Sequence, residues 1–173
     1  GTLVWEDYFN TALKEYGRAL EINPNSAEAR VGKGMVLLRK PSFEKFSKNF
    51  DPFLGPRIEF QLALRVNPFA ARAHLGLAMV SFGTLTAAEK ELRKAAALDP
   101  NNTLAHRLLG LVLLYKSNGE EEQVREAIRE FRKAGIAESD LLNSLPASLP
   151  ENLKMAVANV IRPSRSAPKK RVR

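Results

Sequence analysis

A chain of 173 residues with 45% hydrophobic content is long and apolar enough to bury a core, which argues against intrinsic disorder. It has no cysteine, so disulfides, thiolate catalysis and cysteine-based zinc sites are excluded. The net charge is +8, but six of those positive charges lie in residues 162–173, which contain no acidic residue, and only +2 remains for residues 1–161. The basicity belongs to the tail, so a basic stripe along the body is not indicated.

Apolar periodicity predicts helices over residues 4–20, 26–40 and 57–66 in the first part of the chain. Asn25 or Ser26 is the expected N-cap of the second of these helices, and Pro41 ends it.

Residues 41–55 form an insertion that is rich in phenylalanine. Phe43, Phe46, Phe50 and Phe53 are spaced three, four and three residues apart, which places them on one face of an amphipathic helix. We favour packing of these rings onto the adjacent helices, since exposed aromatic stripes are uncommon in soluble monomers. The alternative is a docking arm for a partner protein.

Further helices are expected over residues 71–82, 85–98, 103–117, 120–133 and 151–161. Gly135 ends the fourth of these, and the two prolines of residues 141–150 favour an extended or turn-rich path before the last helix. After Pro163 the tail has no apolar content that could hold it, so we expect it to be disordered.

The helices repeat in sequence. An aromatic residue or leucine followed three residues later by alanine occurs four times: Tyr16/Ala19, Phe60/Ala63, Leu92/Ala95 and Phe131/Ala134. A small residue recurs in the first helix of each unit, at Gly34, Ala78 and Gly110, and the segments 19–25, 63–68 and 97–102 are similar to one another.

These features resemble the tetratricopeptide repeat, a helix–turn–helix unit of roughly 34 residues. The resemblance implies an all-α fold, a right-handed α-solenoid closed by a C-terminal capping helix. The family's usual tryptophan is replaced by Arg30, His74 and His106, and the equivalent alanines are unevenly spaced.

On this basis residues 1–161 are one helical repeat domain, and residues 162–173 are a basic tail. The domain comprises a second helix at 4–22, repeats at 25–67 (with the insertion 41–55), 69–99 and 102–135, and a cap at 140–161. Because the helix at 4–22 has no first helix, we expect the chain to be a fragment of something longer; an aromatic cap is the alternative.

Stacked repeats of this family expose a concave surface lined by their first helices. The residues expected to form this peptide-binding groove are apolar apart from one arginine: Val31, Met35, Leu38, Leu75, Met79, Phe82, Arg107, Leu111 and Leu114. Such a groove suits an apolar or amphipathic peptide or helix, whereas a clamp for a terminal carboxylate would need more cations. The alternative is that the groove is filled by the chain's own segments or by a second copy.

The rival hypothesis is nucleic-acid binding or nuclear import through the tail, where Lys169, Lys170, Arg171 and Arg173 form a short basic run. No aromatic residue lies among these cations, which argues against base stacking. No apolar run approaches the roughly 18 residues of a membrane span. We therefore expect a cytoplasmic protein, with a nuclear location as the alternative.

Enzymatic activity is the weakest hypothesis. His74 and His106 occupy equivalent positions in successive repeats, but two histidines are too few for a zinc site, so we interpret them as packing residues. No phosphate loop, nucleophile elbow or pair of catalytic carboxylates is found. The sequence thus predicts an adaptor or scaffold for another protein or peptide, with no cofactor and no catalytic residues.

Overall fold

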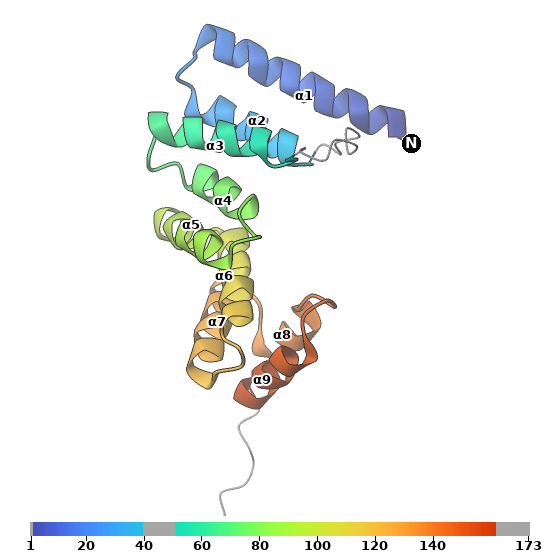
Figure 1. Cartoon of the computed structure of the whole chain (residues 1–173), viewed down its shortest axis with the longest axis vertical. Helices are drawn as coiled ribbons and strands as arrows, with labels where there is room; N and C mark the ends of the chain where they lie inside the picture. The colour runs from blue at the N-terminus through green and yellow to red at the C-terminus, as the bar shows by residue number, and fades with distance from the viewer. Residues whose placement is uncertain (1, 40–50, 162–173) are drawn as a thin grey trace, which may run out of the picture. The chain divides into compact units, whose positions relative to one another are not determined.

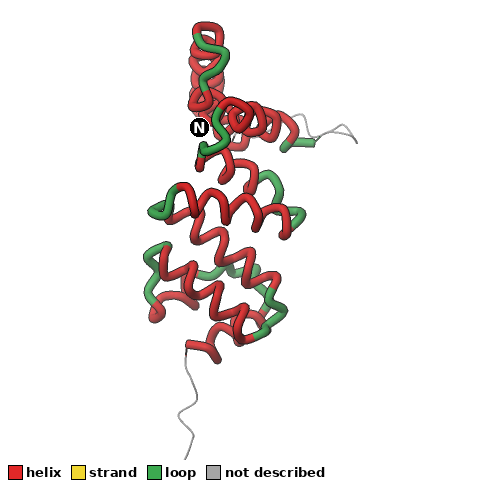
Figure 2. The backbone as a smooth tube through the Cα atoms, turned by 90° about the vertical axis from the view of Figure 1, so that its left-hand side faces the viewer, coloured by secondary structure: helices red, strands yellow, loops and turns green. Residues whose placement is uncertain are grey.

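The computed structural model describes residues 2–39 and 51–161 of the protein (Figure 1). Within these residues the chain forms nine helices joined by loops and turns, and no strand (Figure 2). The helices are α1 (Thr2–Ile22), α2 (Ala27–Arg39), α3 (Leu54–Val66), α4 (Ala71–Met79), α5 (Leu85–Leu98), α6 (Thr103–Lys116), α7 (Glu121–Lys133), α8 (Glu138–Ser144) and α9 (Glu151–Ile161). The all-α class predicted from the sequence is confirmed.

The chain divides into two compact units, Gly1–Pro100 and Asn101–Arg173. The first contains α1 to α5 and the second contains α6 to α9. The division falls between the predicted repeats 69–99 and 102–135, inside what the sequence suggested was a single domain over 1–161.

In the first unit each helix packs against the next along the chain, and α2 also contacts α4 (Figure 1). The Phe60 ring of α3 is completely buried between two glycines of neighbouring helices. A Cβ added to Gly34 of α2 would lie 2.7 Å from this ring, and one added to Gly76 of α4 would lie 2.4 Å from it. Both distances are too short for any side chain, so the helices approach this closely because glycine stands at both positions.

The second unit is built on the hairpin of α6 and α7. A Cβ on Gly110 of α6 would lie 3.0 Å from the Phe131 ring of α7. Helix α9 packs on α7, and α8 contacts α9. Five apolar side chains of this last segment are buried: Leu141, Leu145, Leu149, Leu153 and Val157.

Local sequence signals account for several helix ends. The Ser26 hydroxyl accepts a hydrogen bond from the Ala29 amide at 3.1 Å, and the Asn102 side chain accepts one from the Ala105 amide at 3.0 Å. Gly119 and Gly135 adopt φ of 91° and 79°, in the left-handed region that favours glycine, at the turn before α7 and just after its end.

Two predicted helix boundaries differ from the structure by three residues. Helix α4 ends at Met79 and not at residue 82, because residues 80–83 form turns in which the Ser81 amide donates to the Ala78 carbonyl. Helix α3 begins at Leu54, before Pro56, since a proline in the first turn needs no intrahelical donor.

Residues 138–144 form helix α8, although the neighbouring prolines had suggested an extended path. Pro146 and Pro150 both follow the helix and therefore end it without interrupting it. Glu138 and Asp140 lie in its first turn, where they complement the helix dipole.

None of the helices in residues 2–39 and 51–161 is long and apolar enough to cross a membrane.

Candidate functional site

Each hairpin holds a charged cluster between its two helices, and the α2–α3 hairpin shows its composition. Glu59 of α3 is buried, and its carboxylate accepts from Lys33 Nζ at 2.7 Å and from Arg30 Nη1 at 3.5 Å. Arg30 also donates from Nη2 to the Pro24 carbonyl at 2.9 Å. The cluster therefore joins the two helices to the turn that precedes them.

The α4–α5 hairpin repeats this arrangement with histidine in place of arginine. His74 Nδ1 lies 2.6 Å from Glu91 Oε2, and His74 Nε2 lies 3.0 Å from the Pro68 carbonyl oxygen. Lys94, one turn along α5, donates to Glu91 Oε1 at 3.3 Å. Both nitrogens of this buried ring thus face an acceptor, one on α5 and one in the preceding turn.

The α6–α7 hairpin contains the more buried of the two carboxylate–histidine contacts. His106 Nδ1 lies 2.6 Å from Glu130 Oε2, and Lys133 Nζ donates to Glu130 Oε1 at 2.7 Å. Burial alone would raise the pKa of Glu130, but hydrogen bonds from Lys133 and His106, together with their charges, lower it below the ordinary value of 4.5. The Glu130 carboxylate is therefore held ionised inside the hairpin.

Sequence reasoning missed these glutamates, although a signal was present. Each one directly precedes the recurring aromatic residue or leucine, at Glu59-Phe60, Glu91-Leu92 and Glu130-Phe131. The histidines are buried, as expected for packing residues, and are in addition hydrogen-bonded to the glutamates. No group of three or more His, Cys, Asp and Glu side chains that could hold a metal ion occurs in residues 2–39 and 51–161.

The predicted groove residues of the first unit fall into two groups. Val31 and Leu75, at equivalent positions of α2 and α4, are buried and cannot contact a peptide in this conformation. The others are partly exposed: Met35 and Leu38 on α2, Met79 at the end of α4, and Phe82 in the following turn.

The predicted groove residues of the second unit all lie on α6. Leu114 is completely buried, Leu111 is partly exposed, and Arg107 is exposed. Arg107 Nη2 lies 3.5 Å from the Ser144 carbonyl at the end of α8, so this cation faces the unit's own cap segment.

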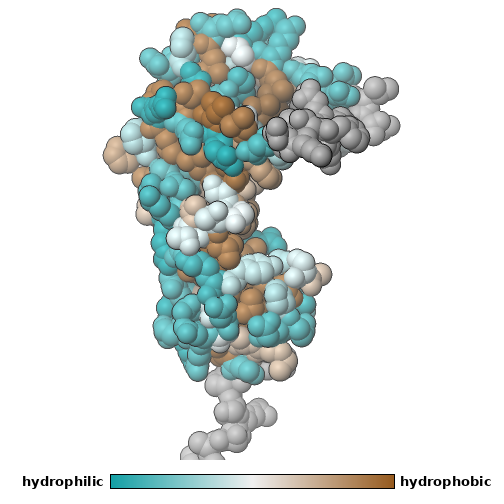
Figure 3. Space-filling model, in the orientation of Figure 1, coloured by the Kyte–Doolittle hydropathy of each residue, from teal (hydrophilic) through white to brown (hydrophobic). Residues whose placement is uncertain are grey.

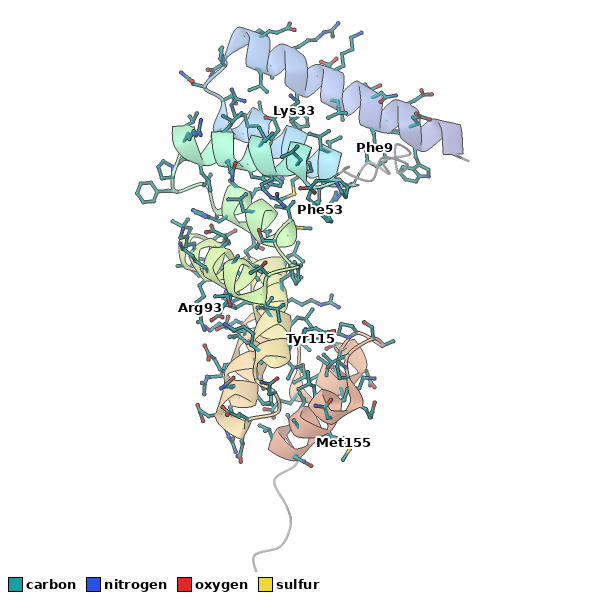
Figure 4. The ribbon with its side chains drawn as sticks, viewed as in Figure 1. Phe9, Lys33, Phe53, Arg93, Tyr115 and Met155 are labelled. Carbon is teal, nitrogen blue, oxygen red and sulfur yellow. The ribbon has the colours of Figure 1, made fainter. Side chains whose placement is uncertain are left out.

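Apolar side chains also reach the surface near the start of α3. Phe53, Leu54 and Ile58 are 42%, 52% and 44% exposed. Figure 3 shows apolar surface gathered over the helices of the first unit. In the second unit Met155 of α9 is 58% exposed, and Figure 4 shows it extending away from its helix.

Two surface cavities accompany these features. A cavity of 510 Å³ in the first unit is lined mainly by apolar side chains from the end of α3 to the end of α5, including Leu64, Phe69 and Leu98. A cavity of 640 Å³ in the second unit is more polar, with Arg125, Asn152 and Asn159 in its wall. His74 and Lys94, which both contact Glu91, also line the first cavity.

Part of the predicted interaction surface lies outside the described residues. This applies to Phe43, Phe46 and Phe50 of the insertion and to Lys169, Lys170, Arg171 and Arg173 of the tail.

The described helices define an all-α protein in which neighbouring helices within each unit pack against each other. Comparisons of the chain with protein-family models and with curated proteins found no match.

Proposed function

We propose that the chain is a tetratricopeptide-like α-solenoid that acts as a protein–protein adaptor or scaffold. Its ligand is an apolar or amphipathic peptide or helix, bound on the face that the first helices present. The observation that carries this proposal is the partly exposed apolar surface formed by Met35 and Leu38 of α2, Met79 of α4 and Phe82 in the following turn.

That surface pairs Met35 with Met79 and Leu38 with Phe82, each pair 44 residues apart. Helix α2 contacts α4, and Met35 packs against the buried cluster that includes Val31. Leu75 of α4 is also buried. Methionine adapts its shape to irregular apolar ligands, and exposed apolar patches of this kind commonly mark binding sites. A ligand helix would cover these four side chains with its apolar face.

The test is a pull-down with the full chain as bait, followed by mass spectrometry, with and without nuclease. Met79→Glu should remove the bound proteins while the circular dichroism of the domain stays unchanged, because Met79 is only partly buried. Met155→Glu is the matched control, since it makes the same change on an exposed methionine of α9. A chain ending at Ile161 removes the basic tail.

Proteins that survive nuclease and Met155→Glu but are lost with Met79→Glu support the proposal. Some bound proteins could instead be lost on nuclease treatment or on removal of the tail, and still bind the Met79→Glu variant. That result would favour nucleic-acid association through residues 162–173. Loss of the helical signal in Met79→Glu would place that residue in the core and refute the groove.

A further inference from the structure

Helix α1 has the sequence of a second helix, and the structure contains a template for it. A shift of 44 residues carries α1 and α2 onto α3 and α4, so that Tyr16 corresponds to Phe60 and Gly32 to Gly76. The contacts between these residues are equivalent as well. A Cβ on Gly32 would lie 2.3 Å from the Tyr16 ring, and a Cβ on Gly76 would lie 2.4 Å from the Phe60 ring. Helix α3 therefore shows what α1 would contact in a complete hairpin.

The two helices differ on their other side. The Phe60 ring also meets Gly34 of the preceding helix α2 and is completely buried, whereas Tyr16 is partly exposed. Ala12 of α1 is likewise partly exposed, although its counterparts Ala88 and Ala127 have no exposed surface.

The uncovered face of α1 is a regular stripe. It is formed by Tyr8, Ala12, Glu15, Ala19 and Ile22, which are spaced four, three, four and three residues apart along the helix. Tyr8 and Ile22 are 69% and 87% exposed, and the side chain of Trp5, one turn before Tyr8, packs its ring 6.2 Å from the ring of Tyr8. This is the face that α3 uses to hold α2.

Glu15 gives the stripe a defined charge requirement. It corresponds to Glu59, Glu91 and Glu130. It already has an ion pair with the residue three positions later, since Arg18 Nη1 lies 2.9 Å from its carboxylate. The same local pair occurs at Glu91 with Lys94 (3.3 Å) and at Glu130 with Lys133 (2.7 Å). Each of the other three glutamates has in addition an arginine or histidine of a first helix, but the side chain of Glu15 is 60% exposed.

We propose that this face of α1 docks a partner helix of defined chemistry. The helix carries an arginine or histidine opposite Glu15 and, four residues later, a glycine or alanine against Ala12 and Tyr16. The chain itself supplies this pattern three times, in Arg30/Gly34, His74/Ala78 and His106/Gly110, each time opposite a glutamate followed by a large apolar residue. Charge complementarity and the need for a small residue at the contact together specify the occupant.

A second copy of this chain is a poor occupant. All three of its helices with the required pattern are engaged in their own hairpins, where Arg30, His74 and His106 contact Glu59, Glu91 and Glu130. Docking one of them on another copy would break a buried ion pair to form an exposed one, which is unfavourable.

The experiment titrates the full chain with a synthetic peptide of residues 25–39, which contains Arg30 and Gly34 and no tryptophan. Trp5 is the only tryptophan of the chain, so its emission reports on α1. Docking should shift this emission to the blue, and Glu15→Lys should weaken the affinity by about tenfold or more because it replaces the ion pair by a repulsion. Glu21→Lys makes the same charge change on an exposed residue of the same helix outside the stripe and should leave the affinity unchanged.

The decisive arm is a charge exchange. A peptide with Arg30→Glu should fail on the unaltered chain and recover binding on Glu15→Lys, whereas a peptide with Gly34→Leu should bind neither. Because an isolated helix of this length is marginal in water, the same peptide is also joined to the N-terminus through a flexible linker, which raises its effective concentration to about the millimolar range. If the tethered helix leaves Trp5 emission unchanged, or if binding ignores Glu15→Lys, the proposal is overturned. Concentration-dependent self-association that Tyr8→Glu abolishes would also overturn it, in favour of a second copy.

Discussion

Replacing Phe60 by alanine tests the packing of the first unit at its tightest point. The ring has no exposed surface and fills the space between Gly34 and Gly76. Both walls are helix backbone without side chains, so little can move into the space that the ring leaves. A buried phenylalanine replaced by alanine costs about 3–5 kcal/mol, and the rigid walls place Phe60→Ala toward the upper end of that range.

The assay is urea unfolding followed by circular dichroism at 222 nm. With an m-value of about 2 kcal/mol per molar, the expected loss lowers the midpoint by about 2 M. Phe69→Ala is the matched control, because it removes the same atoms from a side chain that is 75% exposed. Its effect should stay within about 0.5 kcal/mol.

Equal midpoint shifts for the two variants would refute the reasoning. They would mean that Phe60 is not enclosed by the two glycines, and that the equivalence between α3 and α1 has no structural basis.

Two further predictions concern the second helices of the hairpins. Ala95→Glu should abolish the cooperative unfolding of the first unit, because it forces a carboxylate into a position with no exposed surface. Ala97→Glu, on the exposed side of α5, is the control and should be tolerated. Equal circular-dichroism spectra and melting curves for the two variants would contradict this prediction. Glu130→Gln should destabilise the protein at neutral pH by about 1–3 kcal/mol, since it removes the charge that Lys133 and His106 contact. The pKa of Glu130 is lowered in the folded state, so its contribution to the free energy of unfolding is present above pH 4.5 and is lost as the pH falls below that value. The difference in unfolding free energy between the protein and Glu130→Gln should therefore shrink from pH 6 to pH 3. A constant difference would show that folding does not favour the ionised form.

Helix positions followed from apolar periodicity and from capping residues, which act locally. Ser26 and Asn102 accept hydrogen bonds from the amides three residues on, as their side chains predict, and Gly135 ends α7 in a left-handed conformation. The errors at α4 and α8 arose where turn hydrogen bonds and distant burial competed with the local pattern. Residues 80–82 continue the apolar periodicity of α4 but form a turn. In α8 the side chain of Leu141 is buried against the rest of the second unit.

The candidate site was harder to predict, because exposure depends on neighbours that are distant in sequence. The 3.6-residue period placed Val31, Met35 and Leu38 on one side of a helix, but Val31 became core and the other two remained partly exposed only through the packing of α2 on its neighbours. The repeat itself was visible in Tyr16, Phe60, Leu92 and Phe131, yet their preceding glutamates went unnoticed, because a glutamate on a helix surface is ordinary until its partner is known.

The sequence by itself determined that this protein is helical and repetitive, since periodicity, caps and recurring small residues are encoded within single turns and need no tertiary contact. Only the tertiary structure decided that Arg30, His74 and His106 meet glutamates across their hairpins, and that the same stripe on α1 is left uncovered. Those facts depend on which helix surfaces come together, and close packing at glycines such as Gly34 and Gly76 sets that pairing in three dimensions.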